Sequence, residues 1–90
     1  ILRLPIANYY YFYRKITMET FLIDKIQEIA FATVTKEESL WQARVLDSIT
    51  IVELVVEIEN EFGISIPFNE IVEDNFETVE RMIIYIQSKK

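Results

Sequence analysis

The chain has 90 residues, of which 51% are apolar, enough for one compact domain and too few for two cores of ordinary size. It contains no cysteine and no histidine, which excludes disulfides, thiolate nucleophiles, imidazole bases and the common zinc sites. We therefore expect a protein that is not an enzyme. One glycine and two prolines supply few turns, so helices are favoured over a many-stranded sheet.

Charge is distributed unevenly along the chain. Residues 1–17 contain three basic residues and no acid, so residues 18–90 carry all 15 acids and a net charge of −9. An acidic surface repels phosphate backbones, so nucleic acid is not an expected partner, whereas proteins with basic patches are. Because no run of carboxylates resembles a calcium-binding loop, we expect no metal site.

The opening segment, residues 1–17, contains an unbroken aromatic block over 9–13 followed by Arg14 and Lys15. It is too short to span a bilayer, and its charges follow the apolar run instead of preceding it as in a signal peptide. We expect no membrane insertion and a cytoplasmic location. Because regular helical sequence opens at Met18, we interpret 1–17 as a non-native or pre-start leader, with a docking arm as the alternative. Exposed aromatics there would promote association of an otherwise monomeric protein.

The folded domain should span residues 18–90, where apolar spacing predicts helices. The first helix spans 18–31, and 32–46 form a long loop pinned by apolar side chains that include Trp41, which we interpret as a packing anchor. The second helix, 48–62, has a continuous stripe of Ile51, Leu54, Val55, Ile58 and Phe62. Thr50 and Glu53 have the spacing of a capping box, and Gly63 suits the residue beyond the helix end.

The remaining chain predicts one short helix and one longer one. Pro67 favours a short helix through 68–72, with Ile71 and Val72 pointing inwards. Thr78 is placed to cap a last helix that ends at Lys90, with a stripe of Val79, Met82, Ile83 and Ile86. The predicted fold is therefore all-α: a small four-helix bundle with three longer helices, one short helix and a long first loop.

The pair Asp47 and Ser48, at the start of the second helix, is the candidate site. A phosphate on the Ser48 hydroxyl would meet the free backbone N–H groups and the positive end of the helix dipole. Asp-Ser before a helix is also common as a simple cap. A non-carrier acidic helical interaction module therefore stays open as an alternative.

Three runs carry a resemblance to a known family: Val45 to Ile49, Val52 to Leu54, and Ile58 to Pro67. Over 18–90 the chain resembles the acyl carrier protein family. The resemblance implies that Ser48 receives 4′-phosphopantetheine from coenzyme A, and that the thiol of this arm carries acyl groups as thioesters. Independently of the resemblance, Asp47 adds a negative charge beside the attachment point, and we expect it to help to hold metal in the transferase complex.

Two positions depart from the family pattern: Ile49 replaces the usual leucine, and Arg44 stands where related carriers often have glycine. The implied partners are a phosphopantetheinyl transferase, an acyl- or aminoacyl-loading ligase and downstream acyl-transfer enzymes. The leading cargo is an acyl intermediate of fatty acid or polyketide type. The alternative is D-alanine or another amino acid, since the same runs look especially similar to the D-alanyl carrier proteins.

A second apolar stripe on the predicted helix two suggests a docking face. Ile49, Val52 and Val56 lie away from the core stripe, and the acids Glu53 and Glu57 border them. Apolar residues ringed by acids suit a transient protein interface, and the family docks this helix into basic grooves of its partner enzymes. The alternative is that the first loop and the short helix cover part of this stripe.

Overall fold

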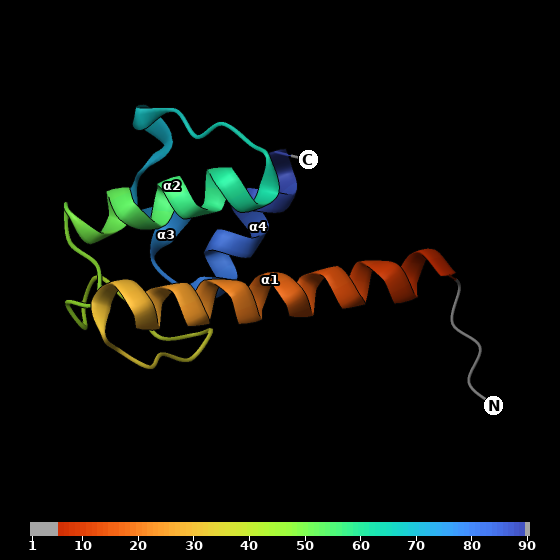
Figure 1. The fold of residues 1–90 in the computed structure, drawn as a ribbon, viewed down its shortest axis with the longest axis horizontal. Coiled ribbons are helices and arrows are strands. Elements are labelled where there is room, and N and C mark those ends of the chain that lie inside the picture. Colours follow the sequence, from red (N-terminus) through yellow and green to blue (C-terminus); the bar gives the residue numbers. More distant parts are fainter. Residues whose placement is uncertain (1–5, 90) are drawn as a thin grey trace.

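The computed structural model describes the backbone of residues 6–89, and the side chains of Arg14 and of residues 16–89. This part of the chain is helical and contains no strand. Its elements are α1 (Ile6–Ala30), α2 (Thr50–Phe62), the 3-10 turn η1 (Phe68–Glu70), α3 (Glu73–Phe76) and α4 (Val79–Lys89). Three longer helices, a short α3 and a long loop between α1 and α2 are visible in Figure 1, which confirms the predicted architecture.

Helix α1 begins twelve residues earlier than the sequence predicted, at Ile6 instead of Met18. The sequence from Ile6 to Ala30 contains neither glycine nor proline, and aromatic residues are tolerated in helices, so nothing interrupts the backbone. Figure 1 shows the N-terminal part of α1 extending beyond the other helices. Met18 is only 2% exposed whereas Ile16 is 46% exposed. The aromatic side chains of 9–13 lie outside the described residues.

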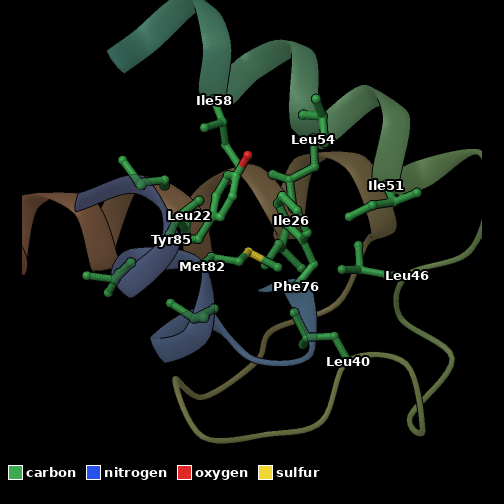
Figure 2. Packing of buried hydrophobic residues seen from close by; sticks show 14 of the residues in the cluster. Leu22, Ile26, Leu40, Leu46, Ile51, Leu54, Ile58, Phe76, Met82 and Tyr85 are labelled. Carbon is green, nitrogen blue, oxygen red and sulfur yellow. The ribbon is translucent and has the colours of Figure 1, made fainter. Parts of the chain in front are cut away.

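One hydrophobic core joins all the main elements. Figure 2 shows side chains from α1, α2, α3, α4 and the first loop pointing into the same interior. The residues predicted for the stripes of the second and last helices are buried, among them Ile51, Leu54, Ile58, Met82, Ile83 and Ile86. Leu22 and Ile26 form the buried face of α1 at the same helical spacing. The apolar period of 3.6 residues therefore identified the buried faces of the three longer helices.

The first loop is anchored to the end of α3 and to the segment that joins α3 and α4. Leu40 and Leu46 are buried in the core, and Trp41 packs against it. The indole Nε1 of Trp41 donates a hydrogen bond to the carbonyl of Phe76 at 3.0 Å, and the Leu40 N–H donates to the carbonyl of Glu77 at 2.8 Å. The loop is thus pinned over the core and Trp41 is a packing anchor, as predicted.

The predicted short helix over 68–72 is wrong in its position. The chain makes one 3-10 turn at Phe68–Glu70 after Pro67, and the short helix α3 follows only at Glu73–Phe76. Val72 has extended backbone angles (φ −122°, ψ 159°) and is 45% exposed, so its predicted inward orientation is also wrong. Ile71 packs against the core as predicted, and Phe76 of α3 is fully buried in it.

The two helix ends predicted from Gly63 and Thr78 are confirmed. Gly63 follows α2 with φ 64°, and its N–H donates to the carbonyl of Glu59 at 3.0 Å. Thr78 accepts a hydrogen bond from the Arg81 N–H through its side-chain oxygen at 3.1 Å, so it caps α4. Lys90, the predicted last residue of this helix, lies outside the described residues.

Candidate functional site

The chain reaches the candidate site through a helical turn that ends at Arg44. The Arg44 N–H donates to the carbonyl of Trp41 at 3.1 Å, and the Val45 N–H donates to the carbonyl of Leu40 at 2.9 Å. These two hydrogen bonds are those of the Schellman motif, whose terminal residue adopts the left-handed conformation and is usually glycine. Arg44 occupies that position with φ 58°. The left-handed conformation explains why glycine suits this position, where this chain departs from the family pattern by having Arg44.

Asp47 caps α2. Its Oδ1 accepts hydrogen bonds from the backbone N–H groups of Ile49 and Thr50, each at 2.9 Å. In return, Thr50 Oγ1 accepts the Asp47 N–H at 2.8 Å. The Ile51 N–H donates to the Asp47 carbonyl at 3.0 Å, so helical hydrogen bonding begins at Asp47, three residues before the regular helix. This reciprocal pair is a capping box.

The predicted capping box between Thr50 and Glu53 is therefore wrong. Asp47, Ser48 and Thr50 were all chemically able to cap, and the hydrogen bonds show that Asp47 does so while Thr50 closes the box from the third position. The overlooked signal was the spacing of Asp47 and Thr50, in which a hydroxyl three residues after the cap reaches back to its N–H. Thr50 is the residue of the site that sequence reasoning placed in the wrong role.

The cap also determines the charge of Asp47. The Thr50 N–H, then the Ile49 N–H and the Thr50 hydroxyl, stabilise its carboxylate and hold the pKa of Asp47 below its ordinary value. Asp47 is consequently ionised at neutral pH. A fixed negative charge stands directly beside Ser48.

Ser48 is exposed, and its hydroxyl has no hydrogen-bond partner anywhere in the described part of the chain. Buried Leu46 and buried Ile51 hold the backbone on either side. The residues present therefore fit a covalently attached phosphodiester, which requires an accessible hydroxyl on a fixed support. One expectation needs correction: the N–H groups of Ile49 and Thr50 are occupied by Asp47, so they are not free to meet a phosphate.

The second stripe of α2 is exposed. Ile49, Val52 and Val56 are 69%, 49% and 47% exposed, so the alternative in which the loop and the short helix cover them is wrong. Glu53 is exposed beside them. Glu57 is half-buried, with its carboxylate 3.5 Å from the Lys25 ammonium of α1.

Neither a membrane-spanning helix nor a cluster of metal-ligating side chains is found among the described residues. Within residues 6–89, no helix combines the length and the apolar character that crossing a membrane requires. The described side chains also form no group of three or more histidine, cysteine, aspartate or glutamate residues able to hold a metal ion.

Residues 46–86 match the family described as "Phosphopantetheine attachment site". The chain is also 38% identical over 69 residues to "D-alanyl carrier protein" of Streptococcus uberis, an alignment covering 74% of this chain and 87% of the relative. The chain belongs to the acyl carrier protein family. Proteins of the same description from Streptococcus sanguinis (38% over 64 residues, 69% of this chain and 81% of the relative) and Streptococcus mutans (45% over 47 residues, 52% and 60%) are similar to it.

Membership establishes the coarse function. This acyl carrier protein is a carrier and not an enzyme, and its cofactor is covalently attached 4′-phosphopantetheine. When attached, the arm supplies the thiol that the chain itself lacks, since there is no cysteine in the sequence. As a carrier, the protein works with a phosphopantetheinyl transferase and with enzymes that load and receive its cargo.

Proposed function

We propose that this protein is a D-alanyl or other aminoacyl carrier whose phosphopantetheine arm is attached to Ser48. One observation carries the choice of residue: Asp47 caps α2, and the Ser48 hydroxyl beside it is exposed and without a partner among the described residues. A serine acting as the cap would instead accept a hydrogen bond from an N–H two or three residues later. The role that would make Ser48 merely structural is thus already taken by Asp47.

The choice of cargo rests on the relatives and on the core. All three similar proteins named above are D-alanyl carrier proteins, which favours the aminoacyl alternative over the fatty acyl or polyketide reading. Leu54 and Ile58 of α2 and Ile83 of α4 are fully buried in the shared core. A small polar cargo leaves such a close-packed interior undisturbed, whereas a long acyl chain entering it would have to displace these side chains.

The exposed stripe of α2 is the docking face in this proposal. Ile49, Val52 and Val56 offer an apolar strip that begins directly after Ser48, and the exposed Glu53 borders it with negative charge, whereas Glu57 pairs with Lys25 of α1. A basic groove on the transferase or ligase would match both properties. Binding there brings the active site of the partner to the end of α2 where Ser48 lies.

The attachment is tested by mass spectrometry. We expect the protein, incubated with coenzyme A, magnesium and a broad-specificity phosphopantetheinyl transferase, to gain the mass of one arm. The Ser48→Ala variant should gain nothing. Ser65→Ala is the matched control, because Ser65 is also exposed and has no hydrogen-bond partner within the described residues. A gain that persists in Ser48→Ala, or none in the parent protein, contradicts the proposal.

The cargo is tested on the modified protein. We expect a D-alanine ligase that adenylates its substrate to load D-alanine as a hydroxylamine-sensitive thioester, and an acyl carrier protein synthetase to load a fatty acid poorly or not at all. Both products are resolved by mass. Loading by the synthetase alone would contradict the aminoacyl cargo and favour a fatty acyl cargo instead.

A further inference from the structure

A phosphodiester attached to Ser48 meets an unusual electrostatic surrounding. The first three N–H groups of the capped helix belong to Ser48, Ile49 and Thr50, and the Asp47 carboxylate occupies the latter two. The N-terminal end of a helix ordinarily favours an added anion through such free N–H groups and through its dipole. Here a carboxylate has already taken most of that capacity. A second anion on the next residue needs a cation from elsewhere.

Arg44 is the nearest cation along the chain. It is the only basic residue between Lys36 and Arg81, a stretch that contains twelve acids. Arg44 is exposed, and its guanidinium has no ion pair or hydrogen bond among the described residues. Its charge is therefore uncommitted, and it stands alone in an otherwise acidic part of the chain.

The backbone at Arg44 adds a second observation. The residue terminates the Schellman turn with φ 58°, a conformation that glycine adopts without strain and that costs a residue with a Cβ atom. The other described non-glycine residue with a positive φ, Phe31 (φ 56°), is uncharged, so among the described residues Arg44 alone combines this conformation with a cation. Because the Arg44 side chain has no structural partner within the described residues, the cation is available to a group outside the fold itself.

We propose that Arg44 binds the phosphodiester at the root of the Ser48-linked arm. The inference rests on the proposed attachment at Ser48. The two positions are four residues apart, so their Cα atoms lie within about 14 Å even for a fully extended chain. A guanidinium presents parallel N–H donors that match phosphate oxygens, and it stays protonated at all relevant pH values. Arg44 thereby balances the charge of Asp47 and the phosphodiester, and biases the arm towards the first loop.

The test uses nuclear magnetic resonance on the full chain, with and without the arm. We expect the Nε–H resonance of Arg44 to shift when the protein is modified, and the phosphorus resonance of the arm to differ between the parent and Arg44→Gln. Both differences should fade in about 1 M salt, where the Debye length falls to about 3 Å. Arg81→Gln is the matched control, since Arg81 is an exposed cation on α4. It should leave the phosphorus resonance unchanged.

Two additional experiments identify the source of the phosphate and show whether a variant has misfolded. Inorganic phosphate or free coenzyme A added to the unmodified protein should not reproduce the Arg44 shift; a shift of equal size would assign Arg44 to the incoming substrate and overturn the proposal. Arg44→Gly removes the cation together with the backbone strain, so it should fold at least as well and show the same phosphorus resonance as Arg44→Gln.

The outcomes separate this inference from the proposed function. A mass gain at Ser48 with no change in the Arg44 resonance overturns the role of Arg44 and leaves the attachment intact. Absence of any mass gain overturns both. A phosphorus resonance that is the same in the parent, Arg44→Gln and Arg44→Gly also contradicts the contact.

Discussion

Neighbouring side chains at the start of α2 have separate tasks. Asp47 uses its carboxylate to satisfy two N–H groups of the helix, and this leaves the hydroxyl of Ser48 exposed. Capping by Ser48 instead would commit the hydroxyl to which we propose that the arm is attached. The same carboxylate puts a negative charge beside this proposed attachment point, which is the reason that Arg44 becomes relevant.

The cap predicts a specific dependence of stability on pH. Hydrogen bonds from Thr50 and Ile49 lower the pKa of Asp47 in the folded protein below its ordinary value of 3.8. Its contribution to stability is therefore complete above about pH 3.8 and is lost as the pH falls through the lower folded pKa. An asparagine in place of Asp47 can still accept these hydrogen bonds but cannot titrate.

This dependence is measured as the difference in unfolding free energy between the parent and Asp47→Asn from about pH 2 to pH 7. We expect the advantage of the parent to shrink on acidification below about pH 3.8 and to be constant above it. Using the difference removes the contributions of the other carboxylates. A difference that is constant over the whole range would show that the carboxylate does not gain from the cap.

The left-handed conformation of Arg44 predicts a stabilising substitution. Arg44→Gly should raise the free energy of unfolding by up to about 1 kcal/mol, because relief of the backbone strain exceeds the extra freedom of glycine in the unfolded chain. Arg44→Ala is the control, since alanine removes the side chain and keeps the strain. Urea unfolding of the three proteins measures the effect. Equal stability of the glycine and alanine variants would contradict the assignment of strain to this residue.

At the scale of elements, α2 has one buried and one exposed face. Ile51, Leu54 and Ile58 face the core, while Val52 and Val56 are about half exposed on the other side. The two stripes interleave in sequence because 3.6 residues complete each helical turn. A substitution can therefore alter the exposed face without opening a cavity in the core.

The exposed face predicts separable effects on partner binding and on stability. Val52→Ala combined with Glu53→Lys should lower the kcat/KM of the transferase by roughly tenfold, chiefly through KM, with a smaller effect at high salt. Thermal unfolding should change little. Ile84→Ala is the matched control, since Ile84 is an exposed apolar residue of α4 and not of α2. Unchanged kinetics in the α2 variant would remove this face from the docking surface.

At the scale of the whole molecule, we propose that the carrier domain comprises residues 18–90. The core begins at buried Met18, and the exposed Ile16 precedes it on the same helix. The bonds that organise the site, between Asp47 and Thr50 and between Trp41 and Phe76, all lie within 18–90. The segment before Met18 extends α1 away from the bundle (Figure 1).

This boundary predicts the behaviour of a variant that begins at Met18. We expect its Tm to lie within a few degrees of the parent value, because no core side chain described for the fold is removed. It should gain the arm at the same rate. Loss of cooperative unfolding in the shortened protein would place part of the folding unit in residues 1–17.

The sequence by itself determined the features that depend on local periodicity and on a short motif. The stripe from Ile51 to Ile58, the left-handed Gly63 and the Thr78 cap follow from rules that operate within one or two helical turns, and the structure has all three. The spacing of Asp47 and Thr50 was a local signal for the cap of α2, whereas only the tertiary structure decided where the short helix lies. Phe76, on that helix, is fully buried, and packing against distant segments selects among local conformations of similar energy.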